Sequence, residues 1–273
     1  NYLIKKTASF YIEFFRNIPL LLQIFFWYFA ALRALPMPED APLLLGSSFM
    51  TIKGLYTPAP VWQNFDIFLI TLIIALILIF FVNRYAKKKQ EEEGKQLPKF
   101  LISVCIFVGL PLITFLSGGF DLSFSFPELK QLAKTSYTYE GGMGIPPELI
   151  ALTIALTLYT ATFIAENVRA GIQGIGKGQK EAAASVGLTP AQVLKLVIMP
   201  QALRIIIPPT TNQYLNLTKN SSLAAAIAYP DLVLVFAGTA MMQTGRAIEI
   251  VAITMATYLS ISLAISLFMN WYN

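Results

Sequence analysis

Histidine is absent from this chain of 273 residues, and cysteine occurs once, as Cys105. The missing histidine removes the commonest general base and the commonest metal ligand, which disfavours hydrolytic and metal-dependent chemistry. A single cysteine cannot form a disulfide within the chain, so cysteine usage does not identify a redox compartment. Because Cys105 lies in an apolar run, we expect it to be a small buried hydrophobic residue.

Charged residues are also scarce: they make up 13% of the chain, whereas apolar residues make up 56% and the mean hydropathy is +0.62. Soluble domains carry about 25% charged residues. The composition therefore indicates an integral membrane protein in contact with lipid. Its net charge of +5 is expected to reflect the orientation of loops at the membrane rather than a nucleic-acid partner.

Six apolar stretches are long enough to cross a bilayer, which takes about 17 to 25 mostly apolar residues. They predict an all-α, polytopic helical bundle that forms a single transmembrane domain over residues 1–273. The fifth stretch is the least regular, because Pro208, Pro209 and several polar residues interrupt it. The predicted spans cover residues 17–35, 66–83, 99–117, 148–168, 203–227 and 249–270.

Basic residues predict the orientation of these spans. Residues 1–16, 84–99 and 169–204 carry 14 of the 20 lysines and arginines, so these segments are expected on the cytoplasmic side. Six spans then place both ends of the chain in the cytoplasm and residues 117–147 in an outer loop. Because the chain begins with Asn1 rather than Met, we also expect a membrane segment upstream of it.

The stretch KEAAASVGLTPAQVLKLVIMP, residues 180–200, has no apolar span of its own. It predicts two short helices joined at Gly187, because glycine tolerates the left-handed conformation in which helices commonly end. Thr189 is expected to cap the second helix, with Pro190 at its first position and Gln192 completing a capping box.

The second helix, which is expected to run to Pro200, carries one apolar side able to pack against membrane spans. The first helix is built of small residues, Ala182 to Ala184, which a groove in a partner can accept closely. An ordinary amphipathic connector is the alternative interpretation of this loop. The apolar side of the second helix consists of Val193, Leu194, Val197 and Ile198.

The neighbouring stretch GIQGIGKG, residues 171–178, comes close to the phosphate-binding pattern G-x-x-x-x-G-K-[ST]. Gly178 stands where the hydroxyl residue that holds magnesium is required, and a membrane helix precedes the loop where a strand is required. We therefore expect this chain to bind no nucleotide, and we expect ATP and magnesium to be bound by a separate subunit.

Polar residues inside membrane spans are costly and tend to face a cavity or a partner. Two polar stripes, one in the fourth span and one in the fifth, predict the lining of a substrate pathway beside the helix break at Pro208 and Pro209. Hydrogen bonding between or within helices is the alternative, and for Glu166 it is an ion pair with Arg169. The candidate pathway residues are Thr157, Thr160, Glu166, Asn212, Asn216, Lys219, Asn220, Ser221 and Ser222.

The stretch EAAASVGLTPAQVLKLVIMP resembles the EAA signature of permease subunits in bacterial ABC importers, which reads E-A-A, three residues, G, nine residues, then I-x-L-P. The matching residues are Glu181, Ala182, Ala183, Gly187 and Pro200, and Val197 and Met199 replace the isoleucine and leucine conservatively. The resemblance implies that the loop at about residues 172–200 docks into the ATP-hydrolysing subunit as a coupling helix. It also implies that Glu181 supplies the polar contact.

Three more stretches resemble permeases of polar amino acids: SFYIEFFRNIPLLLQIFFWYFA, ATFIAENVRAGIQGIGKGQKEAA and MPQALRIIIPPTTNQYLNLTKNSSL. The closing stretch GRAIEIVAITMATYLSISLAISLFMNWYN resembles permeases of general L-amino-acid importers. The chain departs from the plain five-span core of that family by carrying extra spans at 66–83 and 99–117. This extra pair fits the larger, general amino-acid branch.

The resemblance implies an inner-membrane transport subunit of the histidine, glutamate, glutamine and arginine permease family, and no enzyme. The implied partners are a dimer of ATP-binding subunits, a second and related permease subunit, and a periplasmic binding protein that delivers an L-amino acid. This chain itself is expected to hold no metal or cofactor. An ion-coupled secondary transporter, which would show an inverted repeat, and a membrane enzyme are the alternatives.

Overall fold

The computed structural model describes residues 2–44, 46–94, 97–133 and 136–272. They divide into two compact units. The first unit contains the residues up to Asp40, the segment Thr51–Leu55 and the residues from Ile145 onward, and the second contains Ala41–Met50 and Tyr56–Gly144. The prediction that both belong to one transmembrane domain stays a prediction.

The first unit begins with a broken helix. Its parts are α1 (Tyr2–Asn17), α2 (Leu20–Phe25), the π-helical η1 (Phe26–Ala31) and the 3₁₀ turn η2 (Leu32–Ala34). The chain bends by 100° after α1, because Pro19 disfavours helical geometry in the residue before it. The buried Gln23 side chain donates to the carbonyl oxygens of Phe15 at 2.7 Å and Ile18 at 3.0 Å. These bonds satisfy carbonyls that the end of α1 leaves without helical partners.

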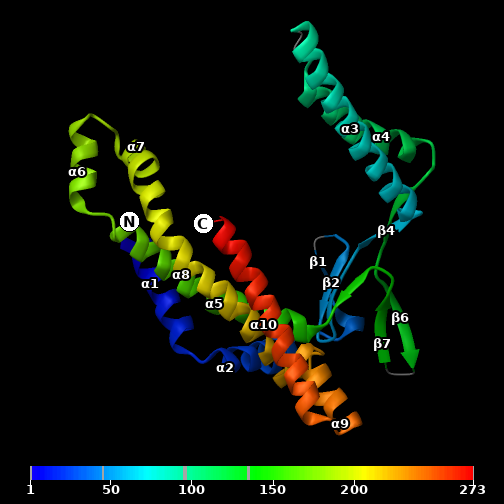
Figure 1. The fold of residues 1–273 in the computed structure, drawn as a ribbon. Helices are drawn as coiled ribbons and strands as arrows, with labels where there is room; N and C mark the ends of the chain where they lie inside the picture. The colour runs from blue at the N-terminus through cyan, green and yellow to red at the C-terminus, as the bar shows by residue number, and fades with distance from the viewer. Residues whose placement is uncertain (1, 45, 95–96, 134–135, 273) are drawn as a thin grey trace. The chain divides into compact units, whose positions relative to one another are not determined.

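Helix α5 (Pro147–Gln173) has α1, α2 and α8 (Met199–Asn220) packed along it (Figure 1). Near the end of α5, Gly171 approaches α8 so closely that a Cβ atom there would lie 2.3 Å from Cγ1 of Ile206. A glycine is therefore required at this contact. The buried side of α5 includes Ala151, Leu152, Ala155 and Leu156, which recur at helical spacing.

A helical stretch of 38 residues, Pro190–Ile227, contains α8. The predicted helix break at Pro208 and Pro209 was wrong, because α8 continues through both prolines. It begins with α7 and the π-helical η4, and it ends with the 3₁₀ helix η5. A short apolar helix, Val233–Thr244, follows in the segment that precedes the last span. The bounds of the remaining elements are α7 (Pro190–Gln192), η4 (Val193–Ile198), η5 (Ser221–Ile227), η6 (Val233–Ala240), α9 (Met241–Thr244) and α10 (Ala247–Tyr272).

The second unit contains two helices that pack against each other, α3 (Phe65–Glu93) and α4 (Lys99–Leu116). No residue of α4 is buried in the described part of the chain. The prediction that Cys105 is buried was therefore wrong: the residue is exposed on α4. An apolar helix of this kind leaves its side chains to be covered by lipid or by another protein.

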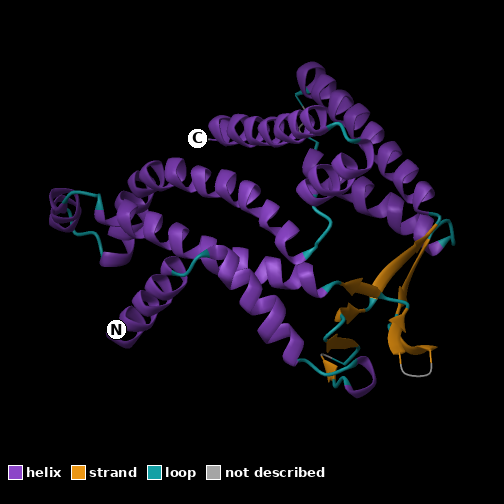
Figure 2. Ribbon diagram, turned by 90° about the horizontal axis from the view of Figure 1, so that it is seen from below, coloured by secondary structure: helices purple, strands orange, loops and turns teal. Residues whose placement is uncertain are grey.

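Short strands lie before α3 and between α4 and α5 (Figure 2). β4 pairs antiparallel with β5, β6 pairs antiparallel with β7, and a four-stranded sheet has the order β1-β2-β3-β8. Their bounds are β1 (Leu43–Leu44), β2 (Ser48–Thr51), β3 (Gly54–Thr57), β4 (Ala59–Gln63), β5 (Asp121–Ser125), β6 (Glu128–Ala133), β7 (Ser136–Glu140) and β8 (Met143–Ile145).

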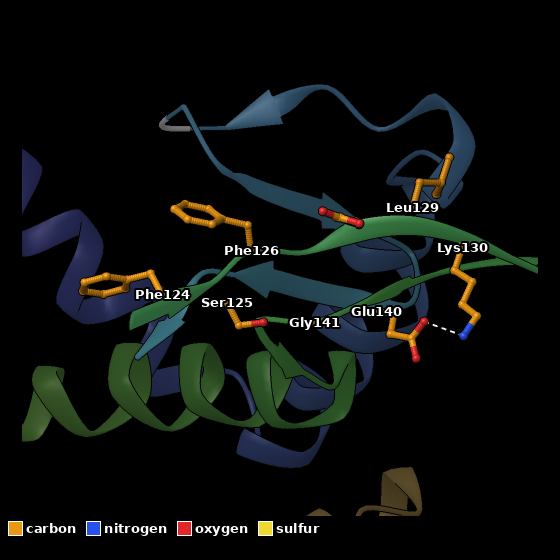
Figure 3. Close-up of a pocket in the computed structure, with 8 residues that line it drawn as sticks. Phe124, Ser125, Phe126, Leu129, Lys130, Glu140 and Gly141 are labelled. Carbon is orange, nitrogen blue, oxygen red and sulfur yellow. Dashed lines mark ion pairs between the residues drawn. The ribbon is translucent and has the colours of Figure 1, made fainter. Parts of the chain in front are cut away.

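A surface recess of about 670 Å³ lies beside β5, β6 and β7 (Figure 3). Lys130 on β6 forms an ion pair with Glu140 on β7, and the rings of Phe124 and Phe126 are more than half exposed. The sequence predicted only an outer loop at residues 117–147. It missed β5 because β5 pairs with the distant β4, and such a partner is not visible in a local pattern. It also missed β6 and β7, which pair with each other locally.

The long helices confirm the predicted membrane class. Five helices in the described residues are long and apolar enough to cross a membrane, and the bent pair formed by α1 and residues 20–34 would be a sixth. The predicted fold class, a polytopic helical membrane protein with about six spans, is confirmed.

Candidate functional site

The loop after α5 contains α6 (Lys177–Ser185). Gly187, which was expected to adopt a left-handed conformation after this helix, has φ of +82°. The N–H group of Gly187 donates to the Ala184 carbonyl at 3.0 Å, and that of Leu188 donates to the Ala183 carbonyl at 3.3 Å. These bonds satisfy carbonyls at the end of α6, as in other helices that end at a left-handed glycine.

The second helix of the loop begins with the predicted capping box. The Thr189 hydroxyl accepts a hydrogen bond from the Gln192 N–H at 3.4 Å, and Oε1 of Gln192 accepts one from the Thr189 N–H at 2.9 Å. Pro190 occupies the first helical position, where no N–H donor is needed. These contacts between neighbouring residues fix the direction in which the chain leaves α6.

The prediction that this helix ends at Pro200 was wrong, because the helix continues through Pro200 into α8. The π-helical η4 ends at Ile198, two residues before Pro200, so the helical hydrogen-bond pattern changes close to the residue that lacks an N–H. The side chain of Gln201 also donates to the Val197 carbonyl at 2.9 Å. One helical stretch therefore joins the loop to a membrane span.

An apolar cluster holds α6 against this second helix. Ala183 of α6 is buried with Val193 and Ile198, and the cluster continues into α8 through Ala202. The predicted apolar side is thus confirmed for Val193 and Ile198, and the partly buried Val197 packs against the same cluster. It is wrong for Leu194, which is 45% exposed.

The outer surface of α6 includes small residues beside a carboxylate, together with the exposed Lys177 and Gln179. Glu181, Ala182 and Ala184 are exposed. Val186 is 77% exposed and adds an apolar side chain that the sequence analysis did not identify. The exposure of Val186 could have been predicted from its place at the C-terminal end of a short helix, because such a residue has few neighbours to pack against.

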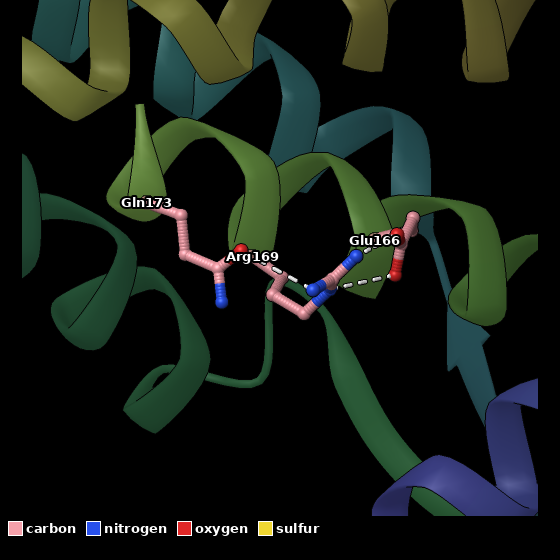
Figure 4. Close-up of polar contacts among 3 residues, drawn as sticks. All are labelled: Glu166, Arg169 and Gln173. Carbon is pink, nitrogen blue, oxygen red and sulfur yellow. Dashed lines mark hydrogen bonds and ion pairs between the residues drawn. The ribbon is translucent and has the colours of Figure 1, made fainter. Parts of the chain in front are cut away.

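Glu166 lies in a polar site separate from the loop around α6, where α1 packs along α5. Its carboxylate accepts a hydrogen bond from Nε of Arg169 at 3.0 Å, and Arg169 also donates to Oε1 of Gln173 at 3.2 Å (Figure 4). These three side chains line a recess of about 440 Å³ together with the α1 residues Lys5, Glu13 and Arg16. The structure therefore brings Glu166 to α1 and to an arginine of its own helix.

The remaining candidate pathway residues differ in exposure. Asn212, Asn216 and Lys219 form an exposed stripe on α8. In α5, Thr160 is buried and Thr157 is exposed. At the end of α8, Asn220, Ser221 and Ser222 are partly buried, and the hydroxyls of Ser221 and Ser222 donate to the carbonyls of Thr218 at 2.8 Å and Lys219 at 2.7 Å. Such bonds are typical of hydroxyl residues in helices.

Comparison with known proteins identifies the family. Residues 97–273 match the family described as "Binding-protein-dependent transport system inner membrane component". The chain belongs to this family. It is a multi-pass permease subunit of the inner membrane, and this membership does not favour an ion-coupled secondary transporter.

Three curated relatives of this permease subunit match over all of its length. It is 49% identical to the putative amino-acid ABC transporter permease protein YhdX of Escherichia coli strain K12, covering 68% of that protein. It is 47% identical to the general L-amino acid transport system permease protein AapQ of Rhizobium johnstonii, covering 67%. It is 39% identical to the glutamate/glutamine/aspartate/asparagine transport system permease protein BztB of Rhodobacter capsulatus, covering 70%.

Proposed function

We propose that this permease subunit carries L-amino acids across the inner membrane as part of an ATP-driven importer. The observation that carries the proposal is the identity of 49% and 47%, over the whole chain, with YhdX and AapQ, which are both named as amino-acid permeases. A binding protein would deliver the amino acid from outside. A dimer of partner subunits would bind ATP and magnesium and hydrolyse the ATP.

The ATP-hydrolysing subunit would dock on α6. The exposed Glu181 and Ala182 would contact it directly, with the carboxylate as the polar contact and the alanine allowing close approach. Ala183 and Gly187 would act by holding α6 in place, because the first is buried in the apolar cluster and the second ends the helix. The apolar cluster joins α6 to the second helix of the loop, and the continuity of that helix through Pro200 supports transmission of a push on α6 to the membrane span.

A substrate pathway along α8 would be completed by a second permease subunit. Asparagine and lysine side chains are costly against lipid, so the exposed stripe of Asn212, Asn216 and Lys219 supports contact with a water-filled pathway. Its amide and ammonium donors suit the carboxylate of an amino acid. Because Glu166 is paired with Arg169, a backbone carbonyl is the better partner for the substrate ammonium group. Thr157, Thr160, Asn220, Ser221 and Ser222 stay candidates for the same pathway.

The docking role is tested with the complex reconstituted in vesicles with its ATPase, second permease and binding protein. Glu181→Arg places a positive charge on the proposed contact. We expect the ATPase activity that the loaded binding protein stimulates to fall about tenfold or more, since a charged contact is lost and reversed. Glu91→Arg makes the same change of charge at an exposed carboxylate of α3 and is expected to leave the stimulated activity unchanged.

Equal activities of the Glu181→Arg and Glu91→Arg complexes would contradict docking at α6. Assembly is checked by the amount of ATPase subunit that purifies with the permease. A variant that purifies without its ATPase also supports docking, whereas a fully assembled and fully stimulated one does not.

A further inference from the structure

A recess of about 360 Å³ lies at the start of α5, where three segments that are distant in the sequence meet. Its lining includes one carboxylate, Glu148, and two basic side chains, Arg33 and Lys53. The fourth polar group is the hydroxyl of Tyr28, which donates to Oε1 of Glu148 at 2.8 Å. All of these residues belong to the first unit, and the pathway proposed above uses none of them.

The segment that carries Lys53 is held by buried hydrogen bonds. The Thr51 side chain is fully buried, and its hydroxyl donates to the Gly54 carbonyl and accepts from the Lys53 N–H, both at 3.1 Å. The N–H of Ile52 donates to the Pro36 carbonyl at 3.0 Å. The fold itself therefore brings Lys53 to the recess, together with Arg33 and Glu148.

We propose that this recess is an outer subsite that binds the charged backbone groups of a free α-amino acid. The proposal rests on the function proposed above and adds a second place at which the substrate is held. Glu148 binds the α-ammonium group, and Arg33 binds the α-carboxylate, with Lys53 adding positive charge to the lining of the same recess. Every α-amino acid carries this pair of charges, so the subsite accepts substrates with different side chains.

The size and the position of the recess agree with this role. Its volume is at the small end of the range of about 300 to 1,000 Å³ found for ligand sites, which suits a single amino acid. The distribution of basic residues predicts that Arg33 and Lys53 lie in outer segments of the chain. A subsite there receives the amino acid from the binding protein before the amino acid enters the pathway along α8.

Tyr28 is a positioning residue for this subsite. Its hydroxyl donates to one carboxylate oxygen of Glu148, and the ammonium group of the amino acid would take the other oxygen, for which the described residues show no hydrogen bond. Because a glutamine at position 148 still accepts the Tyr28 hydrogen bond through its carbonyl oxygen, Glu148→Gln removes the charge while it keeps this contact. The variant therefore tests charge and not folding.

The experiment measures two quantities in vesicles that contain the complete complex and the binding protein. One is ATP hydrolysis, and the other is the uptake of a mixture of the twenty common L-amino acids labelled with carbon-14. We expect Glu148→Gln to lower the amino acids transported per ATP about tenfold, as expected when a charge-assisted hydrogen bond is lost. ATP hydrolysis stimulated by the loaded binding protein is expected to stay within about twofold of the wild type, because docking does not use this recess.

Two further variants serve as controls. Glu39→Gln neutralises an exposed carboxylate of the neighbouring 3₁₀ turn η3 (Pro38–Asp40), which does not line the recess, and is expected to transport as the wild type does. Glu148→Asp keeps the charge and is expected to recover part of the lost transport.

Each contrary outcome has its own meaning. If Glu148→Gln transports like Glu39→Gln, the recess does not hold the substrate. If Glu148→Gln abolishes the stimulation of ATP hydrolysis, the recess is a contact for the binding protein, and the subsite proposal is wrong. If the wild-type complex takes up no amino acid, the proposed function fails and the subsite fails with it.

Discussion

The loop around α6 and the recess at the start of α5 are both fixed by hydrogen bonds, but over very different distances in the sequence. The capping box of the loop joins residues three positions apart. The recess depends on Tyr28 and Glu148, which are 120 positions apart. The capping box therefore depends on residues of the loop itself, whereas the recess requires the tertiary fold of the first unit.

This difference predicts how substitutions at each site affect the stability of the protein. A substitution in the loop is expected to have a small and local effect, because it removes one contact between neighbours. A substitution among the residues that support the recess is expected to separate segments that only the tertiary fold brings together. The three predictions below test this contrast, beginning with the largest effect.

Gly54→Ala is expected to cause the largest loss of stability. Gly54 has φ of +124°, and a Cβ atom there would lie 2.2 Å from the carbonyl oxygen of Ile145. The new methyl group must displace a backbone, which we expect to lower the free energy of unfolding by about 3 kcal/mol. The midpoint of thermal unfolding in detergent measures this loss. Gly178→Ala, at a helical position with no atom within 4 Å of the new Cβ, is the control, and equal midpoints would contradict the prediction.

Thr51→Val keeps the shape of a fully buried side chain but removes its hydroxyl. The Lys53 N–H and the Gly54 carbonyl then lose a partner, and we expect a cost of about 2 kcal/mol. Thr254→Val is the matched control, because the buried Thr254 hydroxyl bonds the Ile250 carbonyl within its own helix. Thermal unfolding of both variants gives the comparison. A loss as large for Thr254→Val would show that the buried turn has no special role.

Thr189→Ala removes one half of the capping box and is expected to cost about 1 kcal/mol. The effect stays local, so hydrogen exchange is expected to become faster at residues 189–192 and to stay unchanged at Thr51. Thr7→Ala is the control, since the exposed Thr7 hydroxyl bonds the Leu3 carbonyl one turn earlier in α1. Unchanged exchange at Gln192 would contradict a contribution of the cap.

The contrast also explains what could be predicted from the sequence. The helix end at Gly187 and the capping box are encoded within a few residues, and both were predicted correctly. The long apolar runs predicted the spans for the same reason, since hydropathy is a local property. Pro200 misled the prediction because a proline usually ends a helix, and the π-helical turn that accommodates it has no clear signal in the sequence.

The recess at α5 could not be predicted, because Arg33, Lys53 and Glu148 lie in three separate segments and each one alone is an ordinary surface charge. Strands β4 and β5 of the second unit escaped prediction in a similar way, since Trp62 of β4 pairs with the distant Leu122 of β5. The ion pair of Glu166 could be predicted, because its partner Arg169 lies only three residues away and the helical spacing indicated this alternative. Only the structure shows that the α1 residues Glu13 and Arg16 line the same recess.

The most direct test of the proposed function is the energy source of transport. Labelled L-amino acids are offered to vesicles that contain the permease complex, with and without ATP, and with and without an imposed proton or sodium gradient. We predict uptake that requires ATP, the ATPase subunits and the binding protein, and that does not depend on the gradient. Uptake driven by the gradient in the absence of ATP would contradict the account.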